Sequence, residues 1–152
     1  MALNEKETTA IKQLQTQEKV CVEKYKKYSS DAKDSVLKDL FQTIGKHEQK
    51  HYDTLGQILS GNVPSCDCND KEGAQYAPTA TYTQMDNTEN KKCDDFLATD
   101  SIGTEKLVSS EYNSDIFTFS DPAIRKALAD IQIEEQNHAQ MLYKYRTVNG
   151  MV

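Results

Sequence analysis

The sequence predicts an all-α fold in which two pairs of long helices are joined by one long connection. On both sides of a turn-rich stretch, apolar residues recur at alternating spacings of three and four, which is typical of helices packed together. Six Gly and three Pro in 152 residues also fit a helix-rich protein better than a sheet protein. This length suits one domain, so we expect a single domain over residues 1–152.

The first helix pair is expected over about residues 3–59. The segment SSDAKD interrupts the apolar pattern and marks a short turn, and Asp34 followed by Ser35 is a good start for the second helix. The predicted buried positions are Ile11, Leu14, Cys21, Tyr25, Tyr28, Leu37, Phe41, Ile44, Leu55 and Ile58. A short turn makes the two helices antiparallel.

The second pair is expected over about residues 94–147. Its break lies at SDP, where Asp121 and Pro122 form a cap and first-turn pair. The predicted buried positions are Val108, Tyr112, Phe119, Ile124, Leu128, Ile131, Leu142 and Tyr145. Gly103 interrupts the first helix of this pair, so the start of that helix is the least defined boundary.

The two halves of the chain align when they are shifted by 87 residues without a gap. Glu18 then falls on Glu105, and Tyr25 falls on Tyr112. The same shift places Asp34 on Asp121, Glu48 on Glu135 and His51 on His138. Because the matches include the polar residues at the centres of the apolar faces, we interpret the chain as a duplicated helix pair.

Residues 60–92 are predicted to be the connector, since Asn, Asp, Thr and Gly are dense there and two of the three prolines lie in it. A connector of this length can run along the whole molecule. One long crossover between the second and third helices is the arrangement of ferritin-like four-helix bundles, which is the architecture we expect.

Ionisable residues interrupt each apolar face halfway along the helix. They are Glu18, Glu48, His51, Glu105, Glu135 and His138. Residues i and i+3 share a helix face, so each Glu-x-x-His presents a carboxylate and an imidazole to one point. A further Glu lies thirty residues upstream of each pair and can sit at a similar depth on the neighbouring helix.

Four buried carboxylates need compensating positive charge, and none of the predicted face positions is Lys or Arg. Two divalent cations would balance them. One Glu from each of two helices with a Glu-x-x-His from each of the other two is the ligand set of carboxylate-bridged dimetal bundles, and its oxygen-rich chemistry suits two iron or manganese ions. The alternative is a bundle that keeps these residues but holds them by carboxyl and Glu–His hydrogen bonds without metal.

Other chemically active residues give weaker predictions. Tyr25 and Tyr112 are expected to be core aromatics that can also lie beside a ligand. His47 is expected to be exposed, Glu23 and Glu111 to face outward or sideways, and Cys21 to be a buried thiol. The spacing of Cys66, Cys68 and Cys93 does not match a zinc site, and cross-linking between molecules through these thiols is a hypothesis.

The charge pattern excludes two classes of partner. The net charge is −6 and the basic residues are scattered, which argues against nucleic-acid binding. No apolar run approaches the roughly 18 residues that span a bilayer. The N-terminal sequence lacks the pattern of a signal peptide, so we expect synthesis in the cytoplasm without a signal peptide.

The sequence resembles the coat F family of bacterial spore coat proteins, a branch of the ferritin-like superfamily. The similar segments are TQEKVCVEKYKKYSSDAKD, KHEQKHYDTL, SSEYNSDIFTFSDPAIRKAL and EEQNHAQMLYKYRTVNGMV. The resemblance implies a ferritin-like bundle, a place in the spore coat of a spore-forming bacterium, and a homodimer or other coat proteins as partners. It also carries the superfamily's ligand pattern over to Glu18, Glu48, His51, Glu105, Glu135 and His138.

Two functions remain open on the sequence. One is a structural or interaction protein of the spore coat whose dinuclear metal site holds the bundle together. The other is a di-iron or di-manganese oxidoreductase that acts on peroxide or dioxygen. The sequence predicts metal ligands in both cases, and it predicts no separate catalytic residues and no organic cofactor.

Overall fold

The computed structural model describes residues 2–65 and 70–152, and over these residues it is all-α, without a strand. It confirms the predicted all-α fold. Its helices are α1 (Glu5–Asp31), α2 (Ser35–Leu59), α3 (Glu72–Gln75), α4 (Glu89–Ile116) and α5 (Pro122–Val148).

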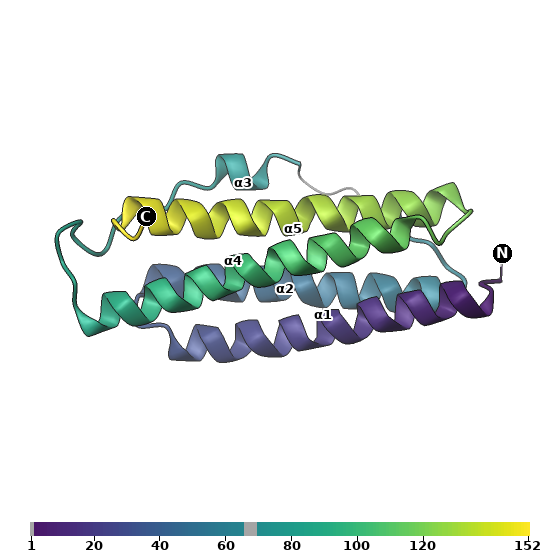
Figure 1. Ribbon diagram of the computed structural model, residues 1–152, viewed down its shortest axis with the longest axis horizontal. Coiled ribbons are helices and arrows are strands. Elements are labelled where there is room, and N and C mark those ends of the chain that lie inside the picture. Colours follow the sequence, from purple (N-terminus) through teal and green to yellow (C-terminus); the bar gives the residue numbers. More distant parts are fainter. Residues whose placement is uncertain (1, 66–69) are drawn as a thin grey trace.

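The four long helices lie side by side along the molecule (Figure 1). Helix α1 packs antiparallel to α2, and α4 packs antiparallel to α5. The two pairs meet where α2 contacts α5 and where α1 contacts α4. Helices α2 and α4 run in the same direction, so the segment between them returns along the whole molecule (Figure 1).

Side-chain caps define where the long helices begin. Asp34 caps α2 by accepting a hydrogen bond of 3.0 Å from the Val36 amide, and Asp121 caps α5 by accepting one of 2.8 Å from the Ala123 amide. Both caps are at the predicted residues. Such caps satisfy amide groups that have no partner within the helix, and each contributes about 1 kcal/mol.

Helix α4 begins at Glu89, earlier than the predicted start near residue 94, and it continues through Gly103. The Thr88 side chain caps it by accepting from the Lys91 amide. Gly103 does not break the helix because it lies on the exposed side, where an added Cβ would meet nothing within 4 Å. A glycine in a helix costs only about 1 kcal/mol relative to alanine. The connector therefore spans residues 60–88.

The connector carries the short helix α3, which the sequence did not predict. It packs against α5: the Gly73 amide donates to the Asn137 Oδ1 atom at 3.1 Å, and Lys144 Nζ donates to the carbonyl oxygens of Ala74 and Tyr76. The placement depends on glycine, since a Cβ on Gly73 would come within 3.1 Å of the Asn137 Cα. The hypothesis of cross-links through Cys66 and Cys68 concerns positions outside the described residues.

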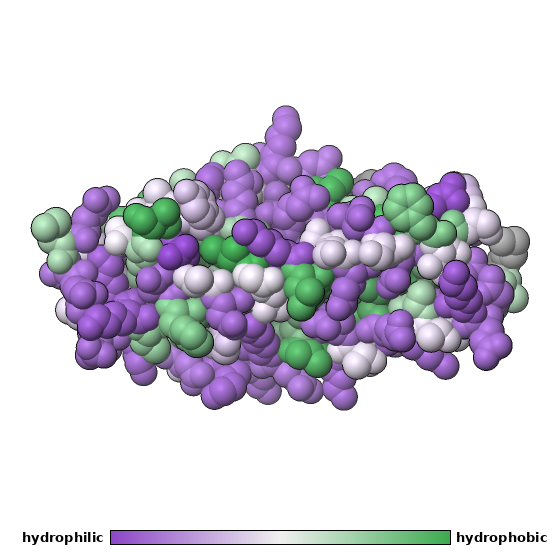
Figure 2. Space-filling model, viewed as in Figure 1, coloured by the Kyte–Doolittle hydropathy of each residue, from purple (hydrophilic) through white to green (hydrophobic). Residues whose placement is uncertain are grey.

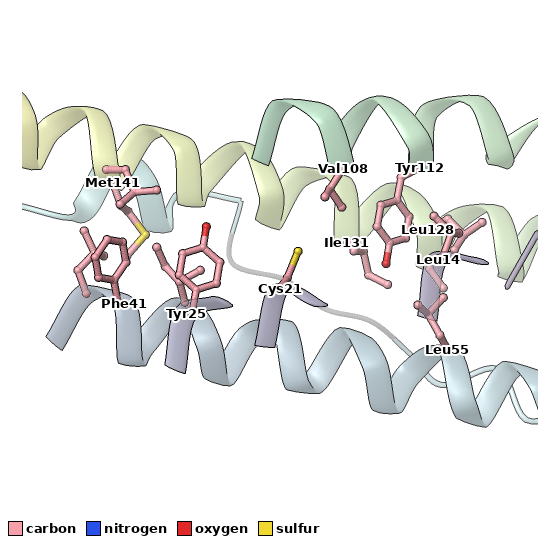
Figure 3. Packing of buried hydrophobic residues seen from close by; sticks show 14 of the residues in the cluster. Leu14, Cys21, Tyr25, Phe41, Leu55, Val108, Tyr112, Leu128, Ile131 and Met141 are labelled. Carbon is pink, nitrogen blue, oxygen red and sulfur yellow. The ribbon is translucent and has the colours of Figure 1, made fainter. Parts of the chain in front are cut away.

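The apolar core runs along the long helices: Phe41, Tyr25 and Met141 lie toward one side of Figure 3, Leu14, Leu128 and Tyr112 toward the other, and Cys21, Val108 and Ile131 lie between them. All the predicted buried positions are buried except Tyr28, which is half-buried. Hydrophilic residues cover most of the face in Figure 2, with hydrophobic ones in separate places. Among the described helices, none is long and apolar enough to span a bilayer.

Candidate metal centre

The structure brings the six predicted ligand residues together in the interior of the bundle. Glu18 comes from α1, Glu48 and His51 from α2, Glu105 from α4, and Glu135 and His138 from α5. Each of these side chains is at most 1 % exposed. All six therefore project inward from four different helices, because each occupies a position on the apolar face of its helix.

The six residues form two overlapping groups, each able to hold a metal ion. One consists of Glu18, Glu48, His51 and Glu135, and the other of Glu48, Glu105, Glu135 and His138. Within each group, one potential ligand atom per residue lies within 4.8 Å of the others. Glu48 and Glu135 belong to both groups, so these two carboxylates lie between the two histidines.

The two histidines turn the same ring nitrogen toward the carboxylates. Nδ1 of His51 lies 3.0 Å from oxygens of both Glu48 and Glu135. Nδ1 of His138 lies 3.4 Å from oxygens of both Glu48 and Glu105. In each ring, the Nε2 atom points away from the carboxylate cluster and is left for a partner outside it.

Two tyrosines contact the outer carboxylates across the interface between the helix pairs. Tyr25 of α1 donates its hydroxyl proton to Glu105 of α4, and Tyr112 of α4 donates to Glu18 of α1. Both phenols are fully buried, and their hydroxyls point in opposite directions in Figure 3. These side chains are thus both core aromatics and partners of the carboxylates, and the contacts tie α1 to α4.

The outer nitrogens of the histidines have different partners. His51 donates its Nε2 proton to Glu134 of α5. Nε2 of His138 lies 3.0 Å from Nδ1 of His47, and the two rings stack with centroids 5.2 Å apart. The expectation that His47 is exposed is therefore wrong. It is partly buried because it packs across the α2–α5 interface against His138.

The carboxylates repel one another in the absence of metal, which is visible in their pKa values. Burial raises the pKa of Glu18 to about 8, and the neighbouring Glu48 carboxylate adds to the shift. Burial and the charges of Glu105 and Glu48 likewise hold the pKa of Glu135 well above its ordinary value. Without metal, these groups therefore retain protons at neutral pH.

The pKa values of Glu48 and His138 shift in the direction that keeps each group charged. Burial by itself raises the pKa of Glu48, but the neighbouring imidazoles of His138 and His51 outweigh it and hold the pKa well below the usual range. Burial opposes charging of His138, yet the Glu105 and Glu48 carboxylates raise its pKa to about 10. The metal-free centre is thus a coupled set of carboxylates, carboxyls and imidazolium groups.

Six buried polar atoms of the centre have no hydrogen-bond partner among the described residues. They are Glu18 Oε2, Glu48 Oε1, Glu105 Oε2, both Glu135 carboxyl oxygens and His138 Nδ1. No lysine or arginine in the described part of the chain forms a salt bridge with the six predicted ligand residues. Buried polar groups normally have partners, so this cluster is suited to binding a cation.

The remaining candidates lie around the centre rather than in it. The Cys21 thiol is buried, and burial together with the nearby Glu48 carboxylate raises its pKa far above the ordinary value, so it stays protonated. Glu23 is exposed and Glu111 is half-buried. These placements agree with the predicted buried thiol and with the outward or sideways direction of the two glutamates.

The second half of the chain matches a known family model. Residues 94–152 match the Coat F domain. The match confirms the predicted resemblance to the coat F family of spore coat proteins. No curated protein and no solved structure matches the chain.

The Coat F domain contains half of the predicted ligand set. It spans most of α4 and all of α5, and thus includes Glu105, Glu135 and His138. The match does not extend over α1 and α2, which provide Glu18, Glu48 and His51. The Coat F domain therefore meets the rest of the cluster only when the two helix pairs pack together.

Sequence reasoning missed two residues that contact the histidines. Glu134 and His47 each precede the glutamate of a Glu-x-x-His segment, and they are related by the same 87-residue shift as the histidines themselves. Their position beside the apolar face was a usable signal. Each lies one residue away from that face, so its side chain crosses to the histidine of the other helix pair.

Proposed function

We propose that this chain is a spore coat protein with a ferritin-like four-helix bundle whose core holds two divalent metal ions. The ligands are Glu18, Glu48, His51, Glu105, Glu135 and His138. The ferritin-like arrangement is supported by the parallel course of α2 and α4, which requires a crossover along the whole molecule. The place in the spore coat is supported by the Coat F domain.

One observation carries the metal site: the cluster of buried polar atoms without hydrogen-bond partners. Four glutamates and two neutral histidines would carry four negative charges, which two divalent ions balance. The donor set fits such ions, since carboxylate oxygens with imidazole nitrogens suit iron or manganese. The two groups that share Glu48 and Glu135 match a pair of ions bridged by these two carboxylates.

The surrounding side chains keep the ligands in place and exclude water. Each outer glutamate accepts a hydrogen bond from a buried tyrosine, which leaves its other oxygen for an ion. The centre is closed from solvent, since each of the six ligand residues is at most 1 % exposed. A pair of bound metal ions would supply either cross-linking between the four helices or oxidation and reduction chemistry.

The structural role is the first candidate function. Ligands from all four long helices mean that bound ions would join both helix pairs, and binding to the folded state stabilises it by mass action. A durable core suits a protein that belongs to an outer layer of the spore. As partners we propose other coat proteins or a second copy of the chain.

The second candidate is an oxidoreductase that acts on peroxide or dioxygen. The observation that favours it is the contact of Tyr25 and Tyr112 with the outer carboxylates, because a phenol is oxidisable and can donate a proton or an electron to a neighbouring group. In this role the two tyrosines would hold and move a proton at the Glu105 and Glu18 oxygens.

Metal analysis of the full chain, purified without chelator and reconstituted with iron or manganese, tests the site. We expect two equivalents of metal in the unchanged protein and none in the Glu48→Ala, Glu135→Ala double variant. An exposed glutamate, replaced in Glu23→Ala, is the control and should keep both equivalents. Absence of metal after reconstitution would leave the hydrogen-bonded bundle as the correct interpretation.

Consumption of peroxide or dioxygen by the reconstituted protein then separates the two candidates. Turnover that is lost in the double variant would support the oxidoreductase. A large rise in thermal stability on metal loading, with no turnover, would support the structural role.

A further inference from the structure

His51 and His138 occupy matching positions in the two halves of the chain, but their Nε2 atoms have different partners. Glu134 and His47 occupy equivalent places one residue before each Glu-x-x-His segment. Glu134 accepts the Nε2 proton of His51, while His47 faces Nε2 of His138. The outer nitrogen of His51 thus has a carboxylate as its partner, and that of His138 has an imidazole.

His47, the imidazole partner of His138, also lies close to a residue of the connector. Nε2 of His47 lies 3.7 Å from Oε1 of Glu72 in α3. This distance is too long for a hydrogen bond, but the negative charge of Glu72 favours a proton on that nitrogen. With its proton on Nε2, His47 presents the lone pair of Nδ1 to His138 and accepts the Nε2 proton of that residue.

This chain of contacts determines which nitrogen of His138 faces the centre as a ligand. When Nε2 of His138 holds the proton donated to His47, the Nδ1 atom is free to bind a cation. That Nδ1 atom has no hydrogen-bond partner and lies 3.4 Å from oxygens of Glu48 and Glu105. His47 and Glu72 therefore orient a ligand without touching the ion themselves.

Gly73 is what allows Glu72 to reach His47. The Gly73 amide donates to Asn137, the residue next to His138, and a Cβ at Gly73 would lie 3.1 Å from the Asn137 backbone and 2.4 Å from the Gln140 side chain. The Gln140 side chain can move, but the Asn137 backbone cannot. A larger residue at position 73 would therefore push α3 away from α5 and take Glu72 with it.

We propose that the connector affects the metal affinity of one of the two positions. Glu72 of the connector and His47 are positioning residues for His138, whereas His51 is oriented by Glu134 of α5, without a contribution from the connector. This inference rests on the proposed dinuclear site. A hydrogen bond to a carboxylate is stronger than one to a neutral imidazole and makes the histidine a better ligand. The position beside His51 therefore binds metal more tightly than the position beside His138.

Titration of the metal-free full chain with Mn²⁺, followed by calorimetry and by electron paramagnetic resonance, tests the proposal. We expect two binding steps whose affinities differ by about tenfold or more, since an outer partner of a ligand contributes roughly 10–100-fold in affinity. His47→Phe should weaken only the second step, and Glu134→Gln only the first. His47→Asn, whose amide oxygen can accept from His138, should restore part of the loss.

The connector is tested by a pair of glycine variants. Gly73→Ala should weaken the second step, while Gly103→Ala, which adds a methyl group into open space, should change neither step. If His47→Phe fails to fold, Glu72→Gln and Gly73→Ala carry the test. Two equal steps in the unchanged protein, or equal effects of the two glycine variants, would overturn the proposal. Failure to bind two ions at all would instead overturn the proposed function.

Discussion

Two polar clusters of this molecule differ in how far their hydrogen bonds are satisfied. The first is the centre of six carboxylate and imidazole side chains, in which six polar atoms lack hydrogen-bond partners. The second lies at the end of the molecule where α1 turns into α2 and the chain ends (Figure 1), and we name it the end cluster. It consists of Asp34, Thr81, Tyr82, Asp94, Tyr145 and Asn149.

The end cluster is saturated with hydrogen bonds. Asp94 accepts from the amides of Lys33 and Asp34 at 2.8 and 2.9 Å, and from the Tyr82 hydroxyl at 2.6 Å. Asn149 accepts from the Tyr82 amide at 3.0 Å and donates its own amide proton to the Tyr145 carbonyl. These bonds fasten the connector, the first turn and the end of α5 to one another.

The difference separates a structural cluster from a binding site. A buried polar group with all its partners specifies one arrangement of the chain, whereas a group without partners costs free energy until a ligand supplies them. The end cluster should therefore stabilise the protein under all conditions. The centre should stabilise it only when cations are bound.

Among substitutions, the largest effect is expected at the end cluster. Asp94→Ala leaves three donors unpaired in a buried place, so the free energy of unfolding should fall by about 3 kcal/mol or more, with or without metal. Urea denaturation followed by circular dichroism measures this. The neighbouring Asp95→Ala, which loses a half-exposed contact to Arg146 and an exposed hydrogen bond from Thr99, should change stability by less than about 1 kcal/mol. Similar losses in both variants would contradict the structural role of Asp94.

A change of opposite sign is expected at the centre. Glu135→Gln removes a carboxyl group that burial and its neighbours keep from ionising, so the metal-free protein should gain about 1–2 kcal/mol of stability. The same variant should bind metal far more weakly. Denaturation with chelator measures the stability of the metal-free protein, and denaturation with added Mn²⁺ measures the stabilisation by bound metal. Destabilisation of the metal-free protein by this substitution would show that the centre is satisfied without a cation.

The pH dependence of stability sharpens the same comparison. Folding raises the pKa of Glu18 from 4.5 to about 8 and that of His138 from 6.5 to about 10. A group whose pKa is raised by folding stabilises the protein below its unfolded pKa and loses that contribution as the pH rises through the folded pKa. The metal-free protein should therefore lose about 5 kcal/mol between pH 5 and pH 8.

The metal-loaded protein should show the opposite slope, because cations displace these protons and bind better as the pH rises. Denaturation midpoints at several pH values, with chelator or with Mn²⁺, measure both slopes. Parallel slopes in the two series would mean that the protons of the centre are not exchanged for metal.

The smallest effects are expected for single hydroxyl groups. Tyr145→Phe removes one donor to Asp34, and Tyr25→Phe removes the donor to Glu105. Each should cost the metal-free protein about 1 kcal/mol. Metal loading should recover most of the loss for Tyr25→Phe, since an ion takes over the Glu105 carboxylate, and none of it for Tyr145→Phe. Equal recovery in both variants would remove the distinction between the two clusters.

Much of the fold was predictable because the long helices carry their own signals. Asp34 and Asp121 cap helices where the sequence placed them, and the spacing of apolar residues identified most of the core. The start of α4 at Glu89 was predicted too late, near residue 94, because the first half of the helix buries polar and small residues, among them Asp94, Ala98 and Ser101. Helix α3 was missed because four residues are too few to show a period.

By itself, the sequence determined the all-α fold, the resemblance of residues 94–152 to the Coat F domain and the six residues that meet in the core, since helical periodicity fixes which side chains share a face. The tertiary structure decided what surrounds them. The contacts of His47 with His138, of Glu134 with His51 and of Glu72 with His47 join helices that are distant in the chain. Only the packing of the two helix pairs and the return of the connector along α5 bring those residues within a few ångströms, and no local pattern encodes such distances.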